Sequence, residues 1–335
     1  MATSGTVGQT TIDVSTIVEK AFRRCGKLAS TISSELQLSA RENLFLLLTD
    51  LGNRGLSLWC LQKQVLGVHA NQIQFPLATG TVDVLTTLYR TLTTKTGDTI
   101  SGAGWQGIDL GAGSEDAVYN VGVSFTAATN ASLVLENSDD SLTWSTQVAF
   151  APGAVAANIW ICQDSENSTT ARYWRLRDTS GTLPAVGTLD FNVDPYEIPM
   201  AKLSNDDYVA LPNKTFAVPA GSKSLQFWFD KQIDPRLWIW PASQANVDQI
   251  VVWCQRHIQD VGAFSNTIDV PQRWLSYVIK ELSVSCALEI PANELPEGRY
   301  EILVGERNEA LAQAEDGESD GAPISIAPNI RGYTA

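Results

Sequence analysis

The sequence has few of the residues on which most catalytic and metal sites depend. It contains two histidines and five cysteines among 335 residues. It also shows no zinc-ligand spacing, no phosphate-binding loop and no nucleophile elbow. His69 and His257 have no convincing serine or cysteine nucleophile near them in the sequence, so we expect both to be structural or surface residues. These absences predict a protein without enzymatic activity, cofactor or bound metal.

Long apolar runs and a secretion signal are also missing. No run approaches the roughly 20 apolar residues that a membrane-spanning helix needs, and the N-terminus lacks a basic region followed by an apolar one. We therefore expect a chain that neither spans a membrane nor is secreted. The cysteines are odd in number and widely spaced, and most have apolar neighbours, which predicts buried free thiols and not disulfides or metal ligands. They are Cys25, Cys60, Cys162, Cys254 and Cys286.

Basic residues are scarce relative to acidic ones, with 23 Lys and Arg against 37 Asp and Glu and a formal net charge of −14. Residues 94–198 hold four basic and thirteen acidic residues, a net of −9, and residues 289–320 hold two and ten, a net of −8. Proteins that grip DNA need Lys and Arg to contact its phosphates, so this balance argues against such a role. The same charge balance favours a channel through which DNA passes, because acidic side chains repel DNA and leave it free to slide.

Helices are predicted near both ends of the chain. The first follows Asp13 as its N-cap and ends at Gly26, with apolar residues at helical spacing between them. The second has a capping box at Ser39–Glu42, followed by a broad leucine-rich face. In the C-terminal third, Asp269 is placed to cap a helix with Pro271 at its first position, and the same apolar spacing continues into a final helix.

The middle of the chain has the pattern of β-strands. Residues 56–92 contain short β-type runs broken by glycine, proline and asparagine. Residues 94–198 are rich in small polar residues and glycine, and their alternating segments predict a small all-β sandwich. Two aromatic-rich strands around an Asp-Pro turn predict a hairpin at 224–241, with a further strand within 245–259. The alternating segments lie at 117–125, 131–136 and 171–177.

Three blocks within residues 94–198 resemble the discoidin (factor 5/8 type C) jelly roll. They are the segments Trp105–Gly111, Glu136–Trp144 and Ala171–Leu176, in that order. The family usually has glycine where Ser141 stands, so the turn there is expected to differ in detail. The resemblance implies a jelly-roll β-sandwich inserted into the rest of the chain.

Other blocks resemble the head-to-tail adaptor proteins of short-tailed bacteriophages. In Leu44–Trp59 a helix leads into a Gly-Leu-Ser-Leu-Trp strand, and in Phe75–Leu85 a proline-containing turn ends in Gly-Thr-Val-Asp. The Asp-Pro and Trp-Pro pairs of the predicted hairpin are also similar to an adaptor hairpin. The resemblance implies an α+β fold: a helical adaptor core with short β-strands and hairpins, interrupted by the sandwich. The predicted domains are 1–93 (core), 94–198 (insert), 199–320 (core) and 321–335 (extended C-terminal tail).

The resemblance to adaptors also implies a function. It implies a structural virion protein of the phage neck, made in the host cytoplasm, whose dodecameric ring joins the portal protein to the tail nozzle or tail tube protein. The ring would continue the DNA channel for genome retention and ejection without sequence-specific DNA binding. Helices near 13–54 and 271–315 would form its wall. The tail, kept extended by two prolines, would bind the portal, through Ile324, Ile326, Ile330, Arg331 and Tyr333.

The alternative is a glycan-binding or cell-wall-glycan-hydrolysing virion component. Aromatic side chains stack on sugar rings, and the candidates in the insert are Trp105, Trp144 and Trp160, with Trp174 beside them. Each also lies in or beside an apolar alternation, where a core tryptophan is the ordinary expectation. Hydrolysis would need two acids in one cleft, whereas adjacent acids such as Asp139-Asp140 are mostly turn formers.

Overall fold

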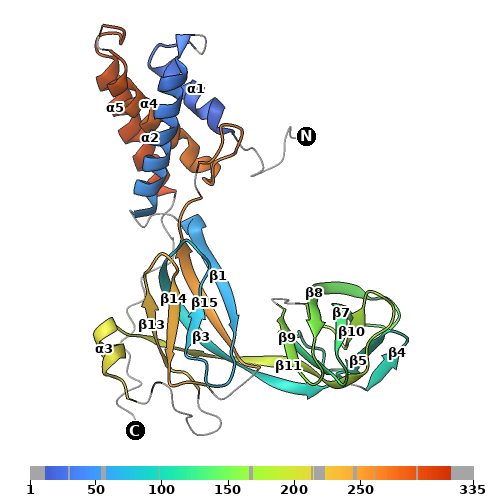
Figure 1. Cartoon of the computed structure of the whole chain (residues 1–335). Helices are drawn as coiled ribbons and strands as arrows, with labels where there is room; N and C mark the ends of the chain where they lie inside the picture. Colours follow the sequence, from blue (N-terminus) through green and yellow to red (C-terminus); the bar gives the residue numbers. More distant parts are fainter. Residues whose placement is uncertain are drawn as a thin grey trace. The chain divides into compact units, whose positions relative to one another are not determined.

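The computed structural model describes residues 12–28, 31–53, 58–97, 99–165, 169–212, 214, 223–243, 247–259, 261–291 and 293–317. The chain forms two compact units (Figure 1). The first joins the two ends of the chain, Met1–Leu61 and His257–Ala335, and the second is Gln62–Arg256. The described residues mix α and β structure. The predicted portal-binding residues Ile324, Ile326, Ile330, Arg331 and Tyr333 lie outside the described residues.

The first unit is helical. Its central helix is α4, which packs against the other three. Apolar side chains from all four helices fill one core, in which Phe22, Leu44 and Trp274 are fully buried. Among the described residues no helix is long and apolar enough to cross a membrane. The helices are α1 (Val14–Arg24), α2 (Ser34–Asn53), α4 (Gln272–Glu289) and α5 (Arg299–Asp316).

The first helix begins and ends where the sequence predicts. Asp13 is its N-cap, and Oδ1 of Asp13 accepts a hydrogen bond from the backbone N–H of Thr16 at 3.1 Å. Gly26 follows the last turn with a φ of 89°. This left-handed conformation favours glycine, so the chain leaves the helix there.

The predicted start of the second helix at Ser39 is wrong. α2 begins at Ser34, because Ser33 already supplies a cap: its Oγ accepts from the backbone N–H of Leu36 at 3.3 Å. Nothing between these serines and Ser39 breaks a helix. Ser39 lies inside α2 and donates to Oε1 of Glu289 at 2.6 Å, which ties α2 to α4.

The predicted cap of the third long helix is also wrong. α4 begins at Gln272, and Pro271 occupies the N-cap position without a side-chain cap. Proline has no N–H and a fixed φ, so it suits the boundary as well as the first helical position. Asp269 bonds elsewhere, and its Oδ2 accepts from the backbone N–H of Gln259 at 3.1 Å.

The second unit contains two β-structures, which we call the base and the sandwich. The base carries the predicted hairpin, with β13 and β14 paired antiparallel, in a four-stranded sheet of order β12-β13-β14-β2. Its core includes Phe75, Phe227, Leu237 and Ile250. The base is made of β1 (Leu61–Gly67), β2 (Gln74–Pro76), β3 (Thr81–Thr96), β12 (Ala201–Lys202), the short α3 (Asn205–Ala210), β13 (Gln226–Asp230), β14 (Arg236–Trp240) and β15 (Gln249–Arg256).

The sandwich has two β layers. A five-stranded sheet of order β4-β5-β10-β7-β8 shares one core with β11, β6 and β9, and this core includes Val123, Leu135, Trp174 and Phe191. The inserted β-sandwich is therefore present. Its strands are β4 (Ile100–Gly102), β5 (Trp105–Asp109), β6 (Asn120–Phe125), β7 (Thr129–Ser138), β8 (Ser145–Val155), β9 (Trp160–Asp164), β10 (Tyr173–Asp178) and β11 (Val186–Pro199).

One six-stranded sheet, of order β1-β15-β3-β11-β6-β9, runs through both the base and the sandwich. The long strands β3 and β11 pair from Leu88↔Pro199 to Thr96↔Asp190, and Figure 1 shows this ribbon leading from one β-structure into the other. The predicted domain limits at 93/94 and 198/199 fall inside these strands. The amino-acid composition changes at these limits because β3 and β11 lie beside different strands on the two sides. The backbone of each strand nevertheless continues across the limit.

Candidate functional site

Two of the predicted glycan-contact tryptophans meet on the outer face of the five-stranded sheet. The ring centroids of Trp105 and Trp144 are 5.7 Å apart. The guanidinium of Arg175 lies 4.0 Å from the ring centroid of Trp144 and 5.2 Å from that of Trp105. Arg175 also forms an ion pair with Glu136 at 2.6 Å. The polar and aromatic groups of this cluster therefore partner one another.

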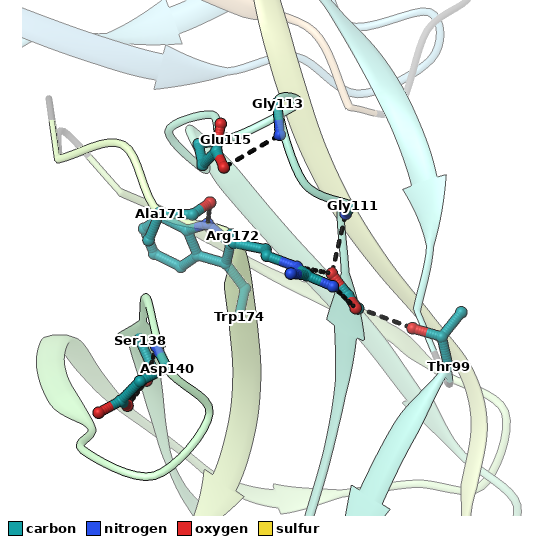
Figure 2. A network of polar contacts seen from close by, with 10 residues as sticks. Thr99, Gly111, Gly113, Glu115, Ser138, Asp140, Ala171, Arg172 and Trp174 are labelled. Atoms are coloured by element: carbon teal, nitrogen blue, oxygen red, sulfur yellow. Dashed lines mark hydrogen bonds and ion pairs between the residues drawn. The ribbon is translucent and has the colours of Figure 1, made fainter.

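Trp174 is a core residue and does not face a ligand. Its side chain is fully buried in the sandwich. Its Nε1–H donates to the backbone oxygens of Asp116 and Ala171, each at 3.1 Å. Figure 2 shows the indole pointing to Ala171. This tryptophan follows the ordinary expectation for an alternating apolar segment.

The loops at one end of the sandwich contain charged side chains that stabilise the loops themselves (Figure 2). Asp109 forms a two-point ion pair with Arg172, at 2.7 and 2.8 Å, which lowers the pKa of Asp109. Asp109 also accepts from the backbone N–H of Gly111 at 2.8 Å. Glu115 accepts from the backbone N–H of Gly113 at 3.1 Å. These acids organise turns and are not free for a ligand.

Asp140 is a turn-forming residue, as the sequence predicts. Its carboxylate accepts from the backbone N–H groups of Thr143 and Leu142 at 2.7 and 2.8 Å. These hydrogen bonds lower the pKa of Asp140 to about 2. Ser141, where the discoidin family usually has glycine, adopts a φ of 60°. The turn therefore keeps the left-handed conformation that glycine favours.

The fold brings together one acid pair that the sequence does not reveal. The carboxyl groups of Asp116 and Asp194 are in hydrogen-bond contact, and this contact raises the pKa of Asp194. The backbone N–H of Asp194 also donates to Oδ2 of Asp116 at 3.2 Å.

Trp160 lies apart from the other tryptophans, on the outer face of the layer that contains β11, β6 and β9. Any side chain at Gly122 of β6 would overlap the indole of Trp160, so the ring lies across this glycine. His69, Trp160, Asp190 and Val247 line a pocket at this point. Nε1 of Trp160 and Oδ1 of Asp190 are buried and have no hydrogen-bond partner in the structure.

Sequence reasoning identified Trp160 as a candidate but missed His69 and Asp190. Asp190 comes next to Gly122 only through the pairing of β11 with β6. His69 comes from the turn between β1 and β2, and no short motif links it to the sandwich. The remaining histidine, His257, lies outside this pocket.

The helical unit exposes apolar side chains on two helices. On α2, Leu38, Phe45 and Leu46 are 47, 44 and 58 % exposed. On α5, Ile302 is 54 % exposed. Gly305, Glu309 and Ala312 follow it at helical spacing and are also exposed, so this face is only partly apolar. α2 and α5 each pack on α4 and not extensively on each other, so these are two separate faces.

The described residues offer little evidence for a metal site or for a reactive cysteine. In this part of the chain no group of three or more His, Cys, Asp or Glu residues is placed to hold a metal ion. All five cysteines are free thiols, and four are buried whereas Cys162 is half-buried, which confirms the predicted free thiols. Burial raises the pKa of Cys25 to about 11, so this thiol is protonated at neutral pH.

No protein-family model matches the sequence, and no curated protein matches it. Among solved structures, CBM62 from Xyl5A of Clostridium thermocellum is similar at 15 % identity over 39 % of this chain and 94 % of its own, with a TM-score of 0.24. The C-terminal domain of a chitobiase from Bacteroides fragilis is similar at 12 % identity over 37 % of this chain and 99 % of its own, with a TM-score of 0.22. A chitosan-binding module from a chitosanase/glucanase of Paenibacillus sp. IK-5 is similar at 16 % identity over 39 % and 88 %, with a TM-score of 0.19.

Proposed function

We propose that this chain is a head-to-tail adaptor of a short-tailed bacteriophage, which assembles into a dodecameric ring in the neck of the virion. The observation that carries the proposal is the pair of separate exposed surfaces on α2 and α5 of the helical unit, each of which combines apolar side chains with an acidic one, Glu42 and Glu309 respectively. A ring built by rotation repeats one heterologous contact, so each subunit must present two different faces that fit each other. The exposed surfaces of α2 and α5 are the two faces that the proposal assigns to this contact.

The two faces differ in shape. Leu38, Phe45 and Leu46 of α2 are bulky and fall within one side of the helix at 3.6 residues per turn. Gly305 and Ala312 of α5 are small, and a Cβ built on Gly305 meets nothing within 4 Å. Small residues let another helix approach closely, at the 8–10 Å separation of packed helices. The bulky face of one copy therefore suits the shallow face of the next.

The other parts of the proposal follow from the resemblance to phage adaptors. The partners are the portal protein on one side of the ring and the tail nozzle or tail tube protein on the other. DNA passes through the channel without sequence-specific binding, in line with the net charge of −14. The chain acts as a structural protein and not as an enzyme.

The assembly test compares two exposed apolar residues on different units. Phe45→Asp places a charge on the α2 face, and Ile233→Asp is the matched control because Ile233 is 93 % exposed at the turn between β13 and β14. The chain is mixed with the portal protein of the same virus and measured by native mass spectrometry and electron microscopy. We expect wild type and the control to form docked rings and Phe45→Asp to remain monomeric. Monomers or dimers for the wild type with portal would refute the proposal.

A second test addresses the C-terminal tail. Deleting residues 321–335 should leave both units folded and weaken portal binding, because the alternating anchors Ile324, Ile326 and Ile330 would be lost. Circular dichroism checks the fold, and sedimentation with portal measures binding. A truncated chain that binds portal as tightly as the full chain would exclude this role for the tail.

A further inference from the structure

The pocket that contains Trp160 lies on the outer face of the layer that contains β11, β6 and β9. Ile161 packs against the sandwich core, so its neighbour Trp160 points to the opposite face of the sheet. Leu189 and Phe191 are buried in the same core, so Asp190 between them also points outward. The two side chains therefore share one face.

Gly122 determines how the tryptophan ring lies on this face. In the register of the sheet, Gly122 of β6 stands between Asp190 of β11 and Cys162 of β9. Because Gly122 has no side chain, the indole of Trp160 occupies the space above it, and any Cβ there would overlap the ring. The indole ring thus packs directly on the backbone of Gly122. An aromatic ring held in this way presents a fixed platform.

Two polar atoms in the pocket have no hydrogen-bond partner, and they indicate which groups a ligand would need. Nε1–H of Trp160 donates a hydrogen bond, and the carboxyl oxygen Oδ1 of Asp190 accepts one. Both atoms are buried without a hydrogen-bond partner in the structure, although buried polar groups are normally paired. A hydroxyl group can accept from the first and donate to the second. His69, which also lines the pocket, adds a further polar group.

We propose that this pocket binds a neutral pyranose sugar. The apolar face of a pyranose would stack on the indole of Trp160, and its hydroxyls would bond Nε1 of Trp160 and Oδ1 of Asp190. Residues 94–198 carry a net charge of −9, so anionic sugars are repelled. The proposal does not depend on ring assembly, since every residue in it belongs to the second unit.

The test uses four neutral disaccharides, lactose, cellobiose, maltose and chitobiose, with the full chain. Binding is measured by tryptophan fluorescence and by the NMR signal of the Trp160 indole N–H, assigned from its loss in Trp160→Phe. We expect at least one disaccharide to bind at concentrations up to about 10 mM and to shift that signal. If lactose binds, 3′-sialyllactose, its anionic counterpart, should bind at least tenfold more weakly.

Variants separate this pocket from the other tryptophan cluster. Trp160→Ala should abolish binding, Trp160→Phe should keep a weakened platform, and Asp190→Asn should reduce affinity about tenfold. Trp144→Ala is the matched control and should bind like wild type, because Trp144 lies on the opposite sheet. Thermal melting checks that each variant folds. Failure of all four disaccharides to bind, or binding that survives in Trp160→Ala and is lost in Trp144→Ala, would overturn the proposal.

Discussion

Arg90 of β3 and Glu197 of β11 form an ion pair across the ribbon that joins the base to the sandwich. Nε and Nη2 of Arg90 both donate to Oε1 of Glu197, at 3.0 and 2.8 Å. The side chain of Arg90 is only 4 % exposed. Its Nη1 donates to Oε1 of Gln249 at 3.0 Å, and its guanidinium lies 5.0 Å from the ring centroid of Tyr119. This arginine therefore connects strands of both β-structures.

We predict that Glu197→Ala destabilises the second unit. The substitution removes the carboxylate of Glu197 from a buried guanidinium, and Glu197 is itself 39 % exposed, so the expected loss is about 1–3 kcal/mol. Chemical denaturation followed by fluorescence measures the free energy of unfolding. Glu301→Ala is the control, because Glu301 is exposed on α5 and should change stability by less than about 0.5 kcal/mol. Equal stability of the two variants would show that the pair contributes nothing.

The continuous ribbon also predicts how the sandwich can be removed. Joining Thr93 to Pro199 through a short Gly/Ser linker deletes Glu197 and the residues that pair with β3 at Tyr89–Thr91. Joining Thr93 to Val193 through an Asn-Gly turn keeps these pairs, because Thr93 and Val193 are opposite each other. We expect both chains to fold and the second to melt about 5–10 °C higher. Circular dichroism provides the melting curves, and equal melting temperatures would contradict this role of the ribbon.

The sequence is sufficient to predict elements that bury one regular face. The segments around β6, β7 and β10 alternate because one face of each strand is buried in the sandwich core, and this period is visible without a structure. The helices around Ile17 and Leu44 are predicted for the same reason. The residues at which these helices begin and end are harder to predict, because the cap depends on which of several serines or prolines the chain uses.

Contacts between segments that are far apart in the sequence cannot be predicted from such a pattern. Trp160, Asp190 and His69 meet because of strand register and a turn in the base, and none of the three segments carries a local signal of the others. The contact between Asp116 and Asp194 has the same origin. The domain limits at 93/94 and 198/199 follow composition, whereas the backbone of β3 and β11 crosses them.

The raised pKa of Asp194 predicts that the stability of the fold depends on pH. Its neighbour Asp116 raises the pKa of Asp194 in the folded chain. The protonated carboxyl therefore stabilises the fold below the unfolded pKa of about 3.8, and this contribution is lost as pH rises through the raised pKa. At pH 7 the two carboxylates repel each other. Asparagine also tolerates the φ of 51° at this position.

We therefore expect Asp194→Asn to raise the melting temperature at pH 7 by about 1–3 °C, a small effect because the site is exposed. The gain should disappear near pH 3, where wild-type Asp194 is protonated. Asp139→Asn, in the turn between β7 and β8, is the matched control. Scanning calorimetry at both pH values measures the difference. A gain that is the same at pH 3 and pH 7 would exclude repulsion as its cause.

The last prediction separates stability of the subunit from assembly of the ring. Gly305 lies within α5 (Arg299–Asp316), on its exposed face, where a new side chain meets nothing within 4 Å. Replacing a helical glycine by leucine removes backbone entropy from the unfolded chain and should stabilise the helix by about 0.5–1 kcal/mol. The same leucine would fill the shallow face on which α2 of the next copy is proposed to pack.

Gly305→Leu should therefore melt at the same temperature as wild type or slightly higher, and yet fail to form rings with portal. Leu46→Ala, which trims the opposing face on α2, should restore part of the assembly in the double variant because the two substitutions change the same contact. Native mass spectrometry counts the copies, and melting is followed in parallel. Normal rings from Gly305→Leu would place the subunit contact elsewhere, since a leucine cannot fit between two helices that pack against glycine.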